Sequence, residues 1–116
     1  MKLIQDLDIY KLAETLSDKI WTDYDTWPTK AKITIGHQII RSADSISANL
    51  AEGFGRGTGK DKKRFFIIAR GSFEETKAWL RKAARRKIIS ETEIKVYGEI
   101  INELGPKLNA FIKATI

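Results

Sequence analysis

A glycine-rich segment at residues 53–61, GFGRGTGKD, is where phosphate-binding chemistry could be expected, because the backbone N–H groups of such loops hold phosphate oxygens. A Walker loop that ends here requires glycine at position 54 and serine or threonine at position 61. This chain has Phe54 and Asp61 there. The dinucleotide pattern G-x-G-x-x-G also fails, and the segment follows a predicted helix and not a strand. We interpret this segment as a turn between the predicted second and third helices, with Gly53 as the C-cap of the second. Two cations of this segment could still contact an anion: Arg56 and Lys60.

Nucleophilic catalysis and metal binding lack the residues they need. The chain has no cysteine and one histidine, His37, which lies away from the serines of residues 41–49 in helical register. Metal sites in helical bundles combine glutamates with Glu-x-x-His motifs, and this sequence has none. Glu52 and Glu75 could form paired carboxylates if their helices align, although an ion pair with Arg41 is the preferred interpretation. We therefore predict no catalytic residue, no metal, no cofactor and no enzymatic activity.

The predicted second helix carries a stripe of small uncharged polar residues. A solvated helix face usually carries Lys and Glu, whereas short hydroxyls and amides suit close packing with directed hydrogen bonds. We predict that this stripe forms a polar seam against another helix or another subunit, with a plain solvated face as the alternative. Its uncharged members are Thr34, Gln38, Ser42, Ser45 and Asn49, with Arg41 and Glu52 at its edge.

The predicted third helix carries a basic stripe that extends over more than five turns and is interrupted by Glu74. The chain has a net charge of +6, which favours association with polyanions. Several cations along one face would neutralise phosphates and give salt-dependent, sequence-independent binding to RNA or DNA. A solvated face is the alternative. With the two cations of the glycine-rich segment, the candidate nucleic-acid-binding residues are Arg56, Lys60, Lys63, Arg70, Lys77, Arg81 and Arg85.

Four helices must position these stripes, because apolar residues repeat at helical spacing along nearly the whole chain. The first is expected over about residues 8–26, and the second from a Thr29 cap to about residue 54. The third is expected from residue 60 or 61 to about 88, and the fourth after the capping box that Ser90 opens. Short connections make successive helices antiparallel neighbours. We therefore predict an all-α, antiparallel up-down-up-down four-helix bundle, with residues 1–116 as a single domain.

Three further expectations concern local packing. Gly71 in the middle of the third helix indicates close approach of a neighbouring backbone. Gly105 and Pro106 should kink or interrupt the fourth helix. The tryptophans are expected as core or interface anchors: Trp21, Trp27 and Trp79.

The buried faces of the last two helices follow from the same spacing. The third helix should bury Phe65, Ile68, Ala69, Ser72, Phe73, Thr76, Trp79, Leu80 and Ala83. The fourth should bury Ile94, Tyr97, Ile101, Leu104, Leu108 and Phe111. The N-terminal residues lack the apolar run of a signal peptide, and no stretch approaches the ~20 apolar residues of a membrane helix. The expected location is cytoplasmic, without membrane association.

Two segments carry a specific resemblance. Residues 41–56 read RSADSISANLAEGFGR, and residues 65–75 read FFIIARGSFEE. The sequence resembles the four-helix-bundle proteins encoded in intervening sequences of bacterial 23S rRNA genes, whose pattern is approximately R-S-x-x-S-I-x-x-N-I-A-E-G followed by an aromatic-led helix with A-x-G-S-x-x-E. Leu50 replaces the isoleucine of that pattern conservatively. The opening residues 7–13 also look like the family's first helix, so the likeness covers nearly the whole chain.

The resemblance implies an up-and-down bundle that forms a homo-oligomer, typically a ring-like pentamer, without established enzymatic activity. The accessory variability determinant proteins of diversity-generating retroelements look like relatives; they are basic, bind a reverse transcriptase and associate with nucleic acid. The expected partners are therefore further copies of the chain and RNA, DNA or a nucleic-acid-handling protein, with a purely structural assembly scaffold as the alternative. The signature positions, expected to join the second and third helices and to order the assembly, are Arg41, Ser42, Ser45, Asn49, Glu52, Gly53, Ser72 and Glu75.

Overall fold

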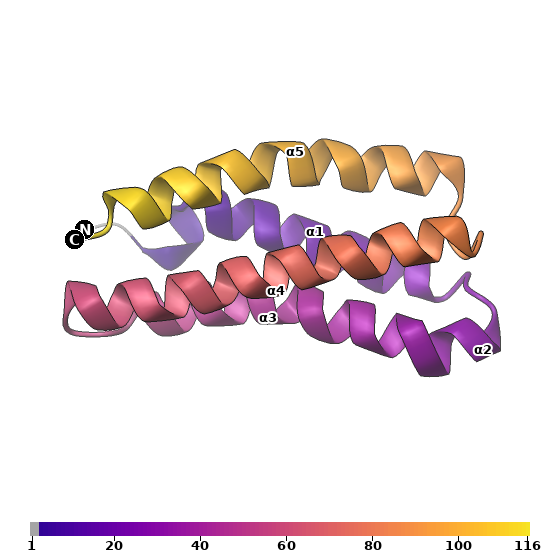
Figure 1. The fold of residues 1–116 in the computed structure, drawn as a ribbon, viewed down its shortest axis with the longest axis horizontal. Coiled ribbons are helices and arrows are strands. Elements are labelled where there is room, and N and C mark those ends of the chain that lie inside the picture. Colours follow the sequence, from indigo (N-terminus) through magenta and orange to yellow (C-terminus); the bar gives the residue numbers. More distant parts are fainter. Residues whose placement is uncertain (1–2) are drawn as a thin grey trace.

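The computed structural model describes residues 3–116, which form an all-α, antiparallel four-helix bundle (Figure 1). A 3₁₀ turn at Ile4–Asp6 precedes α1 (Asp8–Tyr24). The second long segment joins α2 (Thr29–Ala31), a π-helical stretch (Lys32–Gly36) and α3 (His37–Phe54). It is followed by α4 (Gly59–Arg85) and α5 (Glu91–Ala114). Successive long segments run in opposite directions, so the predicted fold class is confirmed.

Two side-chain caps determine where α4 and α5 begin. Ser90 Oγ accepts a hydrogen bond from the Glu93 amide at 3.1 Å, and Glu93 Oε1 accepts one from the Ser90 amide at 2.6 Å. This is the predicted capping box. Thr58 Oγ1 accepts from the Asp61 amide at 3.2 Å, so α4 begins at Gly59, slightly earlier than expected. It also ends earlier, at Arg85, because the backbone turns at Lys87, whose φ is 58°.

Two predicted caps are wrong. Thr29 is the first helical residue after Pro28, and its side chain makes no capping hydrogen bond. Gly53 lies buried inside α3, and the C-cap is Gly55 in a right-handed conformation. A Cβ at Gly53 would lie 2.7 Å from the Phe66 ring, so glycine is required there by close helix packing and not by a left-handed cap.

The π-helical stretch was not predicted, because no residue pattern in the sequence distinguishes it from an α-helix. Gly36 ends it where the chain packs tightly: a Cβ there would lie 2.9 Å from the Ala31 carbonyl oxygen and 3.0 Å from the Tyr24 ring. The Tyr24 hydroxyl donates a hydrogen bond to the Lys32 carbonyl at 3.1 Å. The stretch thus fits the end of α1 against the start of the second segment.

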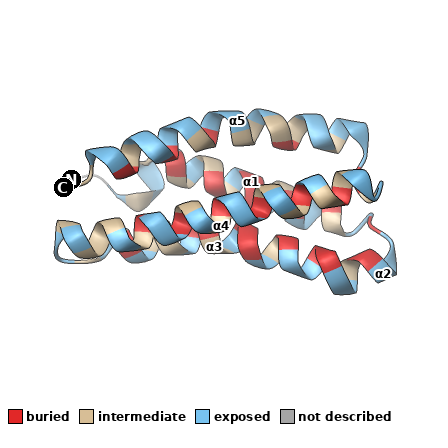
Figure 2. Cartoon of the chain, in the orientation of Figure 1, coloured by how far each residue is buried: buried red, intermediate tan, exposed pale blue. Residues whose placement is uncertain are grey.

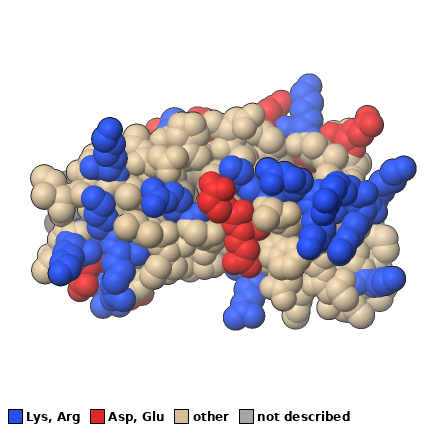
Figure 3. Space-filling view, viewed as in Figure 1, with Lys and Arg blue, Asp and Glu red and all other residues tan. Residues whose placement is uncertain are grey.

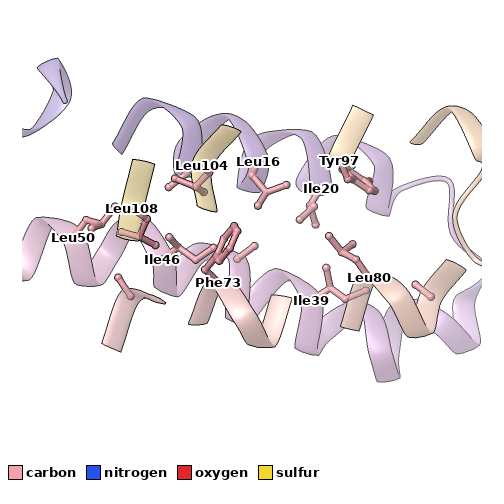
Figure 4. Close-up of a cluster of buried hydrophobic side chains, with 14 of the residues drawn as sticks. Leu16, Ile20, Ile39, Ile46, Leu50, Phe73, Leu80, Tyr97, Leu104 and Leu108 are labelled. Carbon is pink, nitrogen blue, oxygen red and sulfur yellow. The ribbon is translucent and has the colours of Figure 1, made fainter. Parts of the chain in front are cut away.

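The hydrophobic core runs along the bundle axis, where all four long segments turn their buried faces inward (Figure 2). Figure 4 shows apolar side chains of α1, α3, α4 and α5 pointing toward one another. The predicted core side of the second helix is confirmed, since each of its members is buried: Ile35, Ile39, Ala43, Ile46 and Leu50.

The predicted buried face of α4 is partly wrong. Phe66 is buried and not Phe65, and Ile68 is 43% exposed. The true face is centred on Phe66, Ala69, Phe73, Thr76, Leu80 and Ala83, which is a narrower stripe than the one predicted.

The α5 face shows similar differences. Ile94 is 40% exposed, whereas Ile112 is buried. The helix continues through Pro106, so of the predicted kink or interruption the interruption is wrong. Pro106 leaves one helical carbonyl without its donor, and it lies on the exposed side where water can replace that donor.

The tryptophans and Gly71 also differ from expectation. Trp27 is buried and Trp79 half-buried, but Trp21 is 65% exposed and so is no core residue of this chain. Gly71 is exposed, and a Cβ there would meet no atom within 4 Å. No backbone of the described chain approaches it, so the predicted reason for this glycine is wrong.

The four long segments define two faces on opposite sides of the bundle. α1 packs against α3 and α5, and α4 packs against the same two helices, so α1 and α4 are diagonal neighbours. The α1–α3 face is therefore opposite the α4–α5 face. Among the helices of residues 3–116, none combines the length and apolar content that crossing a bilayer requires.

Candidate functional site

A network of small polar side chains joins α3 to α4. The Ser45 and Ser72 hydroxyls are 2.9 Å apart, and Thr76 Oγ1 donates to Ser42 Oγ at 2.9 Å. Asn49 Nδ2 donates both to the Ser45 carbonyl at 2.8 Å and to Ser45 Oγ at 2.9 Å. We call these five residues the hydroxyl seam. The structure thus places Ser42 and Ser45 of the predicted polar stripe against a neighbouring helix of the same chain. Four other members of the stripe are exposed: Thr34, Gln38, Arg41 and Glu52.

Close packing explains why the seam uses small residues. Ser42 is 4% exposed and Thr76 is fully buried, so each needs a partner for its hydroxyl. Ser42 Oγ donates to the Ile39 carbonyl at 3.1 Å, and Thr76 Oγ1 also lies 2.8 Å from the Ser72 carbonyl. Gly53 extends the close approach beyond the hydroxyls, where its backbone meets the Phe66 ring.

The predicted ion pair of Arg41 with Glu52 or Glu75 does not form in the chain. Glu52 pairs with Arg56 one turn later, and Glu75 Oε2 accepts a hydrogen bond from Trp79 Nε1 at 3.1 Å. Arg41, Glu52 and Glu75 are all exposed, because the helical register turns them away from the α3–α4 contact. Among residues 3–116, Arg41 has no carboxylate within ion-pair distance.

The outer side of the seam opens into a polar groove of about 340 Å³, which we call the α3–α4 groove. It contains an unpaired guanidinium, a carboxylate, an amide and several hydroxyls, so it can donate and accept hydrogen bonds. Its lining residues, five of which are signature positions, are Gln38, Arg41, Ser42, Ser45, Ser72 and Glu75. The remaining signature positions, Asn49, Glu52 and Gly53, lie further along α3.

Most of the candidate nucleic-acid-binding residues lie on one side of α4, which we call the basic face: Lys63, Arg70, Lys77, Arg81 and Arg85. Figure 3 shows basic side chains along the α4 side of the molecule, with acidic side chains between them. Lys77 pairs with Glu74 at 3.3 Å, but within residues 3–116 the other four make no ion pair. This face therefore presents uncompensated positive charge.

The two remaining candidates lie near the turn before α4. Arg56 is less available than predicted, because it pairs with Glu52 and its guanidinium lies 4.5 Å from the centre of the Phe65 ring. Lys60 is exposed in the first turn of α4.

Sequence reasoning missed an apolar groove beside the basic face. It lies between α4 and α5, has a volume of about 340 Å³, and is called here the α4–α5 groove. Its lining residues are Lys77, Leu80, Arg81, Ala84, Ile89, Ile94, Tyr97, Gly98, Ile101 and Asn102. Two small residues, Ala84 and Gly98, keep it open, and a Cβ at Gly98 would meet no atom within 4 Å. Gly98 within a helical pattern was the available signal.

An acidic face on the opposite side of the bundle was also missed. Glu14 and Asp18 lie one turn apart on α1, and Ser47 Oγ of α3 donates to Glu14 Oε2 at 3.1 Å. Partial desolvation, followed by the charges of Glu14 and Asp18, raises the pKa of Asp44 on α3. Trp21 is exposed on the same side of α1, one turn after Asp18. The repeat of acids at four-residue spacing was the signal in the sequence.

A buried tyrosine ties α5 to α1. The Tyr97 hydroxyl donates to Asp23 Oδ2 at 2.6 Å, and Lys19 Nζ pairs with Asp23 Oδ1 at 2.9 Å. Burial, followed by the hydrogen bond to Asp23, strongly raises the pKa of Tyr97. Asp23 thereby joins the buried side of α5 to the end of α1. Across residues 3–116, no group of three His, Cys, Asp or Glu side chains lies close enough to hold a metal ion.

Comparisons with known proteins agree with this picture of the fold. The family model of 23S rRNA-intervening sequence proteins matches residues 5–110. A crystal structure of a protein of unknown function from the S23 ribosomal protein family of Bacteroides thetaiotaomicron is similar, with a TM-score of 0.83 and 23% identity. The match covers 91% of this chain and 96% of that one, and at this identity it supports the fold alone. No curated protein matches the chain.

Proposed function

We propose, from the premise that this chain belongs to the family of 23S rRNA-intervening sequence proteins, that it is a non-enzymatic, self-assembling module that binds RNA. The observation that carries the RNA part is the row of uncompensated cations on the basic face. Phosphate neutralisation by such a row gives binding without base readout. An RNA-handling protein complex is the setting in which this activity would operate.

Self-assembly is supported by what the bundle leaves exposed. The α3–α4 groove presents Arg41, which has no carboxylate within ion-pair distance among residues 3–116 and is therefore available to a carboxylate of a second copy. Trp21 and Ile33 are the most exposed large apolar side chains of the described helices, at 65% and 70%. Exposed large apolar groups of this kind mark interaction surfaces. We propose a homo-oligomer, with the ring-like pentamer of the resemblance as the expected form.

A salt titration of RNA binding tests the first part. The probe is a single-stranded RNA of mixed sequence, measured by fluorescence anisotropy between 50 and about 200 mM salt. The affinity should fall steeply, with a logarithmic slope of roughly −0.7 for each phosphate contacted on a single strand. Reversing three cations of the basic face, Lys63→Glu, Arg70→Glu and Arg85→Glu, should weaken binding at low salt and flatten the slope.

A matched variant separates the basic face from total charge. Lys11, Lys30 and Lys113 are exposed on other parts of the bundle and make no ion pair in the described chain. Reversing these three changes the net charge equally and should leave most of the affinity. Equal loss in both triple variants would refute a localised site, and absence of binding by the parent protein at low salt would eliminate RNA binding.

The alternative function is a protein assembly scaffold without a nucleic-acid role. Glu74 favours it, because this exposed carboxylate interrupts the basic face and pairs with Lys77. Light scattering distinguishes the outcomes in combination with the salt titration. An oligomer that ignores RNA supports the scaffold, and a strict monomer at micromolar concentration contradicts assembly in either form.

A further inference from the structure

The two faces on opposite sides of the bundle are complementary in charge. The α1–α3 face carries carboxylates that make no ion pair among residues 3–116: Glu14, Asp18, Asp25 and Asp44. The α4–α5 face carries the basic face and an apolar groove. A molecule with opposite charges on opposite sides attracts a second copy in the same orientation.

An exposed aromatic side chain stands at the centre of the acidic side. Trp21 is 65% exposed, and it is the one aromatic residue among the exposed large apolar side chains of residues 3–116. Asp18 precedes it by one helical turn and Asp25 follows it by one turn, so carboxylates flank the indole along α1. Tryptophan in such a setting is the residue type most enriched among the energetic centres of protein interfaces.

The α4–α5 groove has the corresponding features. Its floor is apolar, formed by residues such as Leu80, Ile89 and Ile101, and Ile94 is 40% exposed at its edge. Lys77 and Arg81, one turn apart on α4, form its cationic rim. The groove volume of about 340 Å³ gives room for an indole ring, and Gly98 leaves the α5 side open.

We propose that Trp21 of one copy enters the α4–α5 groove of a second copy, with Asp18 and Asp25 facing Lys77 and Arg81. The contact is head-to-tail, because it joins two different surfaces, and it repeats until the subunits close a ring or continue as a filament. This inference rests on the self-assembly part of the proposed function and names its surfaces. The cations outside the groove, Lys63, Arg70 and Arg85, stay available to phosphates.

The first test removes the aromatic anchor. Trp21→Ala should weaken self-association by about 30-fold or more, which is the effect of truncating an interface hot spot. Sedimentation velocity over a concentration series measures the change. The fold should be unaffected because Trp21 is exposed, and circular dichroism with thermal unfolding checks this. Ile67→Ala, which truncates another exposed large apolar side chain that lines neither the α4–α5 groove nor the α3–α4 groove, is the matched control and should assemble like the parent protein.

The second test uses the head-to-tail geometry. Asp18→Lys and Arg81→Glu should each weaken assembly alone, because each places like charges across the contact. A chain that carries both changes, Asp18→Lys and Arg81→Glu, should recover assembly, since every contact then joins two reversed surfaces whatever the number of subunits. RNA affinity of the Asp18→Lys protein should match that of the parent monomer.

The outcomes separate this inference from the proposed function. A parent protein that assembles while Trp21→Ala assembles equally well overturns the inference and leaves assembly standing, with the α3–α4 groove as the alternative surface. Failure of the doubly substituted chain to recover overturns the pairing of Asp18 with Arg81 across the contact. A parent protein that remains monomeric overturns both the inference and the assembly part of the proposed function, whereas RNA binding is decided by the salt titration alone.

Discussion

The two long sides of α4 make very different contacts. Toward α3, the helix packs closely through hydroxyls and glycine, and the hydrogen bonds of the hydroxyl seam cross the contact at 2.9 Å. Toward α5, the helix packs loosely and leaves the α4–α5 groove, whose walls are apolar and whose rim is basic. On one side, α4 makes a contact with α3 that is specified by directed hydrogen bonds. On its other side, it leaves the α4–α5 groove open.

The difference indicates which contact the chain completes by itself. A buried hydroxyl must be satisfied within the fold, since an unmade hydrogen bond costs about 1–3 kcal/mol. An apolar groove costs the monomer less, and its burial by a partner is favourable in proportion to the area removed from water. The α3–α4 contact is therefore expected to tolerate few substitutions, and the α4–α5 contact many.

The largest expected effect comes from adding one methyl group at the close contact. Gly53→Ala places a Cβ 2.7 Å from the buried Phe66 ring and 3.0 Å from the Lys62 carbonyl oxygen. It should lower the free energy of unfolding by about 2 kcal/mol, within the usual cost of overpacking. Urea denaturation followed by circular dichroism measures the change.

Gly71→Ala is the matched control, because the same methyl group there meets no atom of the chain within 4 Å. Alanine is a better helix former than glycine, so this variant should be more stable by up to about 1 kcal/mol. Two changes of the same sign would show that helix propensity and not packing governs the α3–α4 contact.

The next effect concerns the buried pair of hydroxyls. Thr76→Val keeps the side-chain shape, removes the hydrogen bond donated to Ser42, and should cost about 1–2 kcal/mol. Ser42→Ala alone should cost a similar amount. In a double-mutant cycle the combined variant should lose clearly less than the sum, and additive losses would show that the two hydroxyls are energetically independent.

These positions also show how far the sequence determined the site. Helical periodicity and the Ser90 capping box predicted the bundle, and the uncharged stripe predicted that Ser42, Ser45 and Asn49 face another helix. This prediction was possible because short hydroxyls and amides on one helix face suit close packing with directed hydrogen bonds. Which residues of α4 meet these side chains depends on the rotation of α4 about its axis. The predicted buried face of α4 was too wide to give that rotation.

The errors share one physical cause. Periodicity places residues on a face but does not give the distance between helices. Gly53 was therefore interpreted as a cap although it packs against Phe66, and Gly71 as a packing residue although no atom lies within 4 Å of its Cβ position. Arg41 was paired by charge with Glu52 or Glu75, although local partners at one-turn spacing satisfy both carboxylates. The α4–α5 groove depends on how far two helices separate, and only the three-dimensional arrangement contains that information.

A smaller effect tests the tolerance of the α4–α5 side. Gly98→Ala adds a methyl group where no atom lies within 4 Å, so the isolated chain should gain about 0.5–1 kcal/mol from helix propensity. Thermal unfolding at low protein concentration measures this. The same methyl group narrows the groove, so self-association should weaken while stability rises. A loss of stability would contradict the loose packing of this side.

The smallest effect concerns the acidic face that is proposed to meet the groove. Partial desolvation and the charges of Glu14 and Asp18 raise the pKa of Asp44 above its usual value of 3.8. The folded state therefore holds this proton more tightly than the unfolded chain, and the ionised carboxylate disfavours folding above that raised pKa. Asp44→Asn should stabilise the monomer at pH 7 by no more than about 0.5 kcal/mol, because the group is largely exposed to solvent.

The sign of the pH dependence follows from the direction of that shift. The advantage of Asp44→Asn should be present at neutral pH, shrink as the pH falls through the raised pKa, and vanish below the usual carboxyl range, where Asp44 is protonated in both states. Urea denaturation at pH 7 and pH 3 measures it. Asp25→Asn is the control of equal charge, because Asp25 is not one of the groups that raise the pKa of Asp44. An Asp44→Asn protein that is less stable at pH 7 would show that repulsion on this face is already relieved within the monomer. The basic rim of the α4–α5 groove of a second copy would then have little repulsion between carboxylates to relieve on the acidic face. The groove would have to bind Trp21 through its apolar floor alone.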